Sequence, residues 1–299
     1  MNLAIFSPNQ NPYSETFIQA HKNHIKADKL YYIYGRYLNN LNENGNNFIT
    51  LKKNILSKLK RKFYKTSQTS LLIKALAHKL IKLNIDVILI EYGTHAMKLL
   101  PVLEKADLPF VVHFHGSDAS VRHVIEKNNG YKALFKKASY IIGVSSVMCK
   151  KLRSLGCPYE KLIYNVYGAN PIFKERQPQF SKKQALAIGR FVDKKAPYFT
   201  ILAFEKVVEK HEDAKLVMAG DGILLPTCKN LIKHLGLEKN IEVLGVVAPE
   251  EIAQLMQESY CFVQHSITAE NGDQEGTPLA VLESALSGLP VVSTYHAGI

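Results

Sequence analysis

Short apolar runs alternate with helical patterns along almost the whole chain of 299 residues. The runs have the length of strands that are buried on both faces, and the segments between them have the spacing of helices that cover a sheet. This order predicts parallel sheets. The expected strands are residues 3–6, 30–34, 87–90, 110–112, 140–142 and 162–166, followed by 185–188, 215–219, 241–244, 261–264 and 291–293.

A polar stretch with two prolines, residues 171–184, interrupts the alternation and is the best candidate for a linker. The chain is long enough for two domains with separate cores. We therefore predict an α/β protein with two Rossmann-like, doubly wound parallel-sheet domains that face each other across a cleft. The expected limits are 1–172 for the first domain, 173–184 for the linker and 185–299 for the second domain.

The chain carries 38 basic and 26 acidic side chains and a net charge of +12, which favours anionic partners. Residues 52–65 hold seven Lys or Arg and no acid, with apolar residues at helical spacing. This pattern is typical of a solvated helix face or of a contact with an anionic membrane surface. No nucleic-acid-binding motif accompanies the charge, so nucleic acid is not an expected partner.

Several classes of site have no signature in the sequence. The four cysteines are scattered without a CxxC pair, which argues against a zinc site and suits a reducing cytosol. There is no signal-peptide pattern and no run of 18 apolar residues, so we expect a cytoplasmic location. The phosphate-binding loop of nucleotide hydrolases, the GxSxG elbow and the HExxH zinc motif are also absent.

Two acids, Glu275 and Glu283, stand eight residues apart across the expected start of a helix. Thr277 is expected to cap this helix and Pro278 to occupy its first turn. Free amides at a helix start attract phosphate, and the carboxylates can accept hydrogen bonds from hydroxyl groups on either side of it. A phosphate between two polyols is a nucleotide sugar. A surface acid and a satisfied helix acid are the alternative interpretation.

Glycines and cations follow two other strands of the second half. Gly189 permits a tight turn, and Arg190 and Lys195 could hold a diphosphate, although cations in a loop are often simply solvated. Gly220 and Gly222 permit close approach of a ligand to the backbone, but a tight turn explains them equally well.

In the first half, a histidine-rich strand end reads His113-Phe114-His115-Gly116-Ser117-Asp118. Ligands of parallel sheets bind outside the carboxyl ends of strands, so His115 is expected to reach into the cleft. We expect His113 to help packing and Asp118 to cap the following helix.

These motifs, in this order, resemble the retaining glycosyltransferases of family 4, the group 1 transferases with the GT-B architecture. The resemblance is strongest from residue 185 to the end and is carried by Gly189-Arg190 with Lys195, by residues 220–222, by residues 275–283 and by residues 287–292. The segments 14–18 and 115–118 resemble members that build bacterial surface polysaccharides such as colanic acid.

The resemblance implies roles for these residues. Arg190 and Lys195 would neutralise the leaving diphosphate, and Glu283 would hold the ribose hydroxyls. His115 would contact the donor sugar from the first domain. Glu275 would hold the donor sugar together with the segment formed by Gly276, Thr277, Pro278 and Leu279, with Gly189, Gly220 and Gly222 completing the donor-binding set. Such enzymes need no metal or other cofactor.

We therefore expect a transferase that moves a hexose from a UDP- or GDP-sugar to a glycan or lipid-linked acceptor with retention of configuration, in surface polysaccharide biosynthesis. The alternatives are a nucleotide-sugar epimerase of the same architecture and a non-catalytic subunit that binds sugar nucleotides. Relatives continue beyond the strand at 291–293 with a further strand and helices. We therefore expect a truncated second domain with exposed apolar surface.

Overall fold

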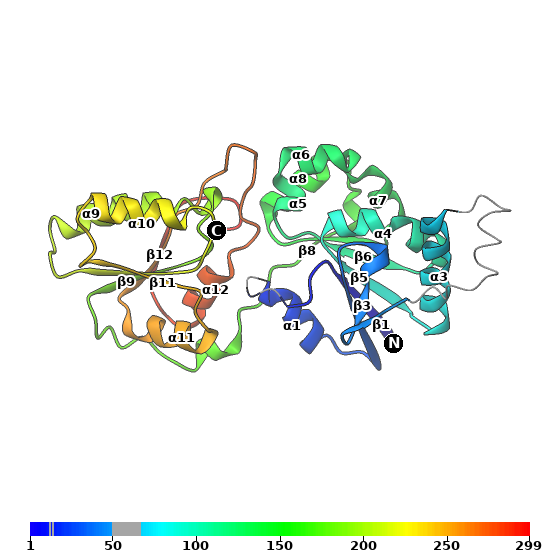
Figure 1. Cartoon of the computed structure of the whole chain (residues 1–299), viewed down its shortest axis with the longest axis horizontal. Coiled ribbons are helices and arrows are strands. Elements are labelled where there is room, and N and C mark those ends of the chain that lie inside the picture. Colours follow the sequence, from blue (N-terminus) through cyan, green and yellow to red (C-terminus); the bar gives the residue numbers. More distant parts are fainter. Residues whose placement is uncertain (12, 14, 50–66) are drawn as a thin grey trace. The chain divides into compact units, whose positions relative to one another are not determined.

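The computed structural model describes residues 1–11, 13, 15–49 and 67–299 (Figure 1). The chain divides into two compact units, Met1–Asn165 and Val166–Ile299. The basic segment 52–65, for which the sequence left a solvated helix face and a membrane contact as alternatives, lies outside the described residues. Among the described helices, none combines the length and the apolar character needed to cross a membrane.

The first unit is built on an eight-stranded sheet with the order β4-β3-β2-β1-β5-β6-β7-β8. Six neighbouring strands of this sheet are parallel, as predicted: β2, β1, β5, β6, β7 and β8. The edge pair β3 and β4 is antiparallel and was not predicted. The strands are β1 (Asn2–Ser7), β2 (Lys29–Tyr34), β3 (Asn42–Glu43), β4 (Asn46–Asn47), β5 (Val87–Glu91), β6 (Phe110–His113), β7 (Tyr140–Gly143) and β8 (Leu162–Tyr164).

Two helices of the first unit begin at serine caps. The Ser67 and Ser145 hydroxyls accept hydrogen bonds from backbone amides of the first turns of α3 and α8. The helices are α1 (Thr16–His24), α3 (Gln68–Lys82), α4 (Gly93–Ala106), α5 (Ser117–Ser120), α6 (Arg122–Lys127), α7 (Lys132–Lys137) and α8 (Ser146–Ser154), with 3-10 turns at η1 (Leu38–Asn40), η2 (Asn129–Tyr131) and η3 (Tyr159–Lys161).

The second unit has a five-stranded parallel sheet with the order β11-β10-β9-β12-β13. Helices α9 and α10 cover one face and α11 and α12 cover the other (Figure 1). The elements are η4 (Pro171–Lys174), β9 (Gln184–Ile188), η5 (Asp193–Lys195), α9 (Pro197–Val208), β10 (Lys215–Ala219), α10 (Leu225–His234), β11 (Ile241–Gly245), α11 (Pro249–Glu258), β12 (Cys261–Gln264), α12 (Leu279–Leu286) and β13 (Val291–Ser293).

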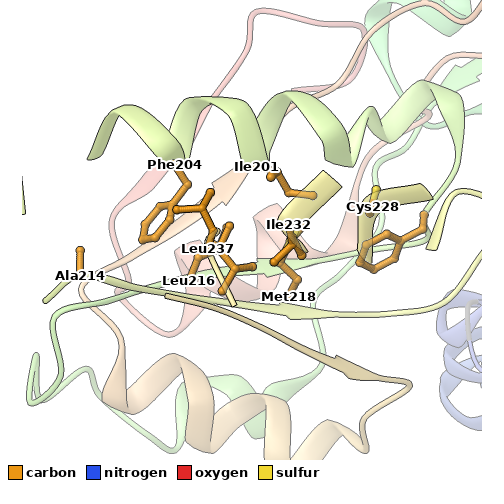
Figure 2. Close-up of a cluster of buried hydrophobic side chains, with 10 residues drawn as sticks. Ile201, Phe204, Ala214, Leu216, Met218, Cys228, Ile232 and Leu237 are labelled. Carbon is orange, nitrogen blue, oxygen red and sulfur yellow. The ribbon is translucent and has the colours of Figure 1, made fainter. Parts of the chain in front are cut away.

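Alternate residues of β10 enter the two cores of this unit. Leu216 and Met218 belong to the core under α9 and α10, whereas Val217 belongs to the core on the opposite face. Figure 2 shows Ile201 and Phe204 of α9 pointing toward β10. A central strand that is apolar on both faces is the pattern expected of a parallel sheet covered by helices.

The stretch predicted as a linker, residues 173–184, lies inside the second unit. Phe173 in η4 is buried, and it packs in the same core as Met256 and Phe262. The described structure therefore divides the chain at residue 165, seven residues before the limit expected from the sequence.

Leu216→Ala should lower the free energy of unfolding of the second unit by about 2–5 kcal/mol, because Leu216 is fully buried and the cavity cannot close completely. Urea unfolding followed by circular dichroism measures the change. Leu202→Ala is the matched control, since the Leu202 side chain is exposed on α9, and it should change stability by less than about 1 kcal/mol. Equal losses for the two variants would contradict the assigned core.

Candidate functional site

Two adjacent lysines in η5 bind the long loop that follows β12. The buried Lys194 Nζ donates hydrogen bonds to Asp273 Oδ1 at 3.1 Å and to the Gln274 carbonyl at 3.2 Å. The Ile267 amide donates to the Lys194 carbonyl at 2.9 Å. Lys194 was not among the predicted site residues. It fixes the loop that carries Glu275.

Lys195 and Glu275, both predicted site residues, are brought together at this loop. Lys195 Nζ lies 3.4 Å from Glu275 Oε2 and donates to Gln264 Oε1 at 3.1 Å. The other carboxylate oxygen, Glu275 Oε1, is buried and accepts no hydrogen bond from any described residue. A buried carboxylate oxygen without a donor is costly, so this atom is suited to a ligand hydroxyl.

The charges around this pair favour an ionised Glu275. Burial raises the pKa of Glu275, but Lys195, Lys194 and Arg190 together hold it below the usual range of a glutamate. Burial lowers the pKa of Lys195, and the attraction of Glu275 opposes this shift without cancelling it. Two carboxylates, Glu275 and the Asp273 partner of Lys194, lie among these three cations, which leaves local positive charge that suits an anionic ligand.

Gly189, Arg190 and Lys195 line a hollow at the carboxyl end of β9. A methyl group on Gly189 would lie 3.3 Å from the Lys195 side chain, so the glycine leaves room for the lysine stem. Arg190 is exposed at this hollow. His265 also lines it, and the buried His265 Nδ1 has no hydrogen-bond partner among the described residues. The sequence analysis missed His265, because a single histidine after a strand carries no distinctive signal.

The structure gives the glycines of the 220–222 loop a packing role. A methyl group on Gly220 would lie 1.9 Å from the Gly189 carbonyl oxygen, and one on Gly222 would lie 2.4 Å from the Phe191 carbonyl oxygen. Both glycines have positive φ, at 138° and 155°. These glycines let the loop after β10 pack against the loop after β9, which lines the hollow.

The helix start differs from the expectation in one respect. The residue that caps α12 is Pro278, so Thr277 does not occupy the capping position and no side chain caps the helix. The amides of Leu279 and Ala280 lie in the first turn, where no intrahelical acceptor exists. Gly276 is packed against the residues after β13, since a methyl group on Gly298 would lie 1.7 Å from the Gly276 carbonyl oxygen.

Glu283 lies in α12 and is half-buried. Burial raises the pKa of Glu283 to about 7. No described residue donates a hydrogen bond to its carboxylate or places a positive charge beside it. The alternative of a satisfied helix acid therefore does not describe Glu283, which has a carboxyl group available for a ligand.

In the first unit, Glu91 ends β5 and is fully buried among histidines. Its two oxygens lie 2.8 Å from His21 Nδ1 and 2.7 Å from His115 Nε2. Burial raises the pKa of Glu91, but the hydrogen bonds from His115 and His21 hold it below the usual range. Glu91 was not among the predicted site residues.

His115, predicted to reach a ligand, has a side chain that is only 2% exposed. Its ring packs against Phe17 and Tyr92, with centroids 4.5 and 4.6 Å away. Asp118 does not cap the following helix as expected, because it lies inside α5. Its carboxylate instead accepts hydrogen bonds from the backbone amides of Gly93, His115 and Gly116.

His21, Glu91 and His113 each offer one ligand atom, and these atoms lie within 4.8 Å of one another. Such a set of two histidines and one carboxylate can hold a transition-metal ion. The separations of 2.7 and 2.8 Å between imidazole nitrogens and the carboxylate are, however, those of charge-assisted hydrogen bonds.

Curated relatives match most of this chain. The amylovoran biosynthesis glycosyltransferase AmsK of Erwinia amylovora is 30% identical over 223 residues, which are 72% of this chain and 54% of that protein. The putative colanic acid biosynthesis glycosyltransferase WcaL of Escherichia coli K12 is 25% identical over 255 residues, 83% of this chain and 63% of that protein. The chain thus spans little more than half the length of these relatives.

Solved structures match the fold over the whole chain. Anabaena HepE, crystallised with UDP, superposes with a TM-score of 0.71 at 16% identity, covering 100% of this chain and 82% of that one. The lipopolysaccharide outer core galactosyltransferase WaaB superposes with a TM-score of 0.62 at 15% identity, covering 99% and 81%. These similarities confirm the predicted α/β fold with two parallel-sheet domains of the GT-B class.

The family model described as "Glycosyl transferases group 1" matches residues 170–299, which include the five described strands of the second sheet, the hollow that Lys195 lines, and Glu275. The second unit of this chain is therefore similar to the group 1 glycosyltransferases over almost its whole length.

Proposed function

We propose that this chain belongs to a glycosyltransferase that moves a hexose from a UDP- or GDP-sugar to a glycan or lipid-linked acceptor, with retention of configuration and without a metal ion. The observation that carries the proposal is the buried pair of Lys195 and Glu275, in which Glu275 Oε1 has no donor among the described residues. An activated sugar supplies both missing groups, because it has hydroxyls for Glu275 and a diphosphate for the cations.

The proposed chemistry is electrostatic. Negative charge builds on the diphosphate as its bond to the sugar breaks, and fixed cations stabilise this charge more than that of the intact donor. Lys195 is held in place by Gln264 and Glu275, so it does not have to reorganise during the reaction. Arg190 and the amides at the start of α12 add donors in the same domain.

Glu283 and Glu275 bind different parts of the donor in this proposal. Glu283 accepts hydrogen bonds from the ribose hydroxyls, and Glu275 accepts them from the donor sugar. His115 is assigned a contact with the sugar, which requires that its side chain, 2% exposed in this structure, become accessible when the donor binds. The relatives named for amylovoran and colanic acid biosynthesis support a role in surface polysaccharide assembly, and the HepE structures with UDP and UDP-glucose support a nucleotide-sugar donor.

The location of the enzyme is part of the proposal. We propose a cytoplasmic protein that attaches peripherally to the inner membrane face through the basic residues 52–65. No observation favours the epimerase or the non-catalytic subunit over the transferase.

Lys195→Gln should lower kcat/KM for sugar transfer by about 100-fold, because one fixed cation beside the leaving diphosphate is lost. Transfer is measured by release of nucleoside diphosphate in the presence of lipid-linked or glycan acceptor pools, and melting temperature is recorded in parallel.

Lys206→Gln is the matched control for this substitution. Lys206 is exposed on α9 and pairs only with surface acids, so its loss should leave kcat/KM within about twofold of the wild type. Full transfer activity of the Lys195 variant would contradict the proposed role of Lys195.

Donor binding should depend on the ionisation of Glu283. The pKa of about 7 lies above the ordinary 4.5, so the folded protein binds this proton more tightly than the unfolded chain does. The free energy of unfolding should therefore fall by up to about 3 kcal/mol as the pH rises from 4.5 to about 7.

Ribose hydroxyls donate to the ionised carboxylate of Glu283, so affinity for the nucleotide should rise between about pH 6 and pH 8.

Calorimetric titration with UDP and GDP across this pH range measures the effect on affinity. Glu283→Gln removes the titrating group, so its affinity should be lower and nearly independent of pH. An unchanged pH dependence in this variant would assign the titration to another group.

A further inference from the structure

Glu91 is a buried charge to which the proposed function assigns no role. It is 0% exposed at the end of β5, and both of its oxygens face imidazoles. His21 from α1 approaches Oε1, and His115 from the loop after β6 approaches Oε2. The His113 ring lies farther away, with Nδ1 3.9 Å from Oε2. Burying an uncompensated carboxylate is expensive, so these contacts are required for the fold to tolerate Glu91.

The carboxylate fixes which ring nitrogens carry hydrogen. An ionised glutamate only accepts hydrogen bonds, so His115 Nε2 and His21 Nδ1 must each be a donor. In a neutral His115 the hydrogen is then on Nε2, and Nδ1 is a hydrogen-bond acceptor. The rest of the residue is held as well, because Asp118 accepts the His115 amide and the rings of Phe17 and Tyr92 cover the imidazole.

The backbone next to Glu91 is strained in a way that supports a role in the site. Tyr92 has φ 71° and ψ 129°, a conformation that side-chain-bearing residues rarely adopt. Its amide donates to the His113 carbonyl and its hydroxyl donates to Glu15 Oε1 at 2.8 Å. Such strain persists only where the surroundings impose it, and it clusters at functional sites.

We propose that Glu91 is a positioning residue for His115: it fixes the orientation and the hydrogen position of the imidazole, with His21 as the second donor that compensates its charge. Glu91 acts through His115 and touches no donor atom. The inference rests on the proposed function, in which His115 contacts the donor sugar. A transition-metal ion bound by His21, Glu91 and His113 is the competing arrangement, and it requires His21 Nδ1 to carry no hydrogen.

The first test uses the wild-type protein and needs no activity. Long-range proton–nitrogen spectra of the histidine rings report which nitrogen carries hydrogen, and the signals are assigned by their loss in His21→Gln and His115→Gln. We expect hydrogen on His115 Nε2 and on His21 Nδ1, the second of which is the uncommon tautomer of a neutral histidine. A bare His21 Nδ1, a bare His115 Nε2, or one equivalent of transition metal in the purified protein would overturn the proposal.

The second test is kinetic. Glu91→Gln keeps the shape of the side chain but has one oxygen acceptor instead of two, so we expect kcat to fall about 10- to 100-fold with the KM for the sugar nucleotide within about twofold. The His21 signal should revert to the common tautomer. Glu104→Gln is the matched control, because Glu104 is exposed at the far end of α4 with only a weak contact to Lys137. An unchanged kcat in folded Glu91→Gln would contradict the proposal.

The two proposals fail in different ways. An inactive wild-type protein that nevertheless gives the expected ring signals would contradict the transferase and leave the Glu91 arrangement intact. An active wild-type protein whose ring signals differ from the expectation would contradict the role of Glu91 alone. If Glu91→Gln does not fold, the spectra of the wild-type protein still decide between the hydrogen-bonded and the metal-bound arrangement.

Discussion

The ion pair between Lys195 and Glu275 is the interaction on which the candidate site depends. A buried carboxylate must be compensated, and the second unit supplies two lysines from one short turn for this purpose. Lys194 fixes the loop through Asp273 and the Gln274 carbonyl, and Lys195 meets the acid that the loop presents. Glu275 Oε1 accepts no hydrogen bond from any residue that the structure describes, and in the proposed function a ligand hydroxyl donates to it.

Each unit places a buried acid close to the carboxyl end of its sheet and compensates it differently. In the second unit the partners are permanent cations, which suit a diphosphate that gains charge. In the first unit the partners of Glu91 are imidazoles, which donate hydrogen bonds and fix ring orientation without adding a permanent charge. The different partners match the different parts of a nucleotide sugar that we assign to the two units.

Much of the fold could be predicted because buried parallel strands are read directly from apolar runs. The expected strands at 215–219, 261–264 and 291–293 have the limits that the structure gives. The hairpin of β3 and β4 was missed because two-residue strands in a polar, asparagine-rich segment leave no apolar pattern. The start of α12 was misplaced by one residue because both Thr277 and Pro278 are common at helix starts.

The site was predictable only in part. Lys195 could be identified because it follows a strand, and Glu275 because it precedes a helix. The structure brings the two side chains together. Lys194 and Glu91 did not stand out because their importance comes from burial and from partners distant in sequence. The glycines at 220 and 222 were identified, but their packing against the carbonyls of Gly189 and Phe191 depends on how two loops meet, which the sequence does not specify.

The most direct test of the central claim is calorimetric titration of wild-type protein and Glu275→Gln with UDP, GDP and the corresponding sugar nucleotides. If Glu275 Oε1 accepts a sugar hydroxyl, the variant should lose about tenfold in affinity for the sugar nucleotide, whereas its affinity for the free nucleoside diphosphate should change little. Equal affinities of the two proteins for the sugar nucleotide, or no binding of either nucleotide to the wild type, would contradict the account.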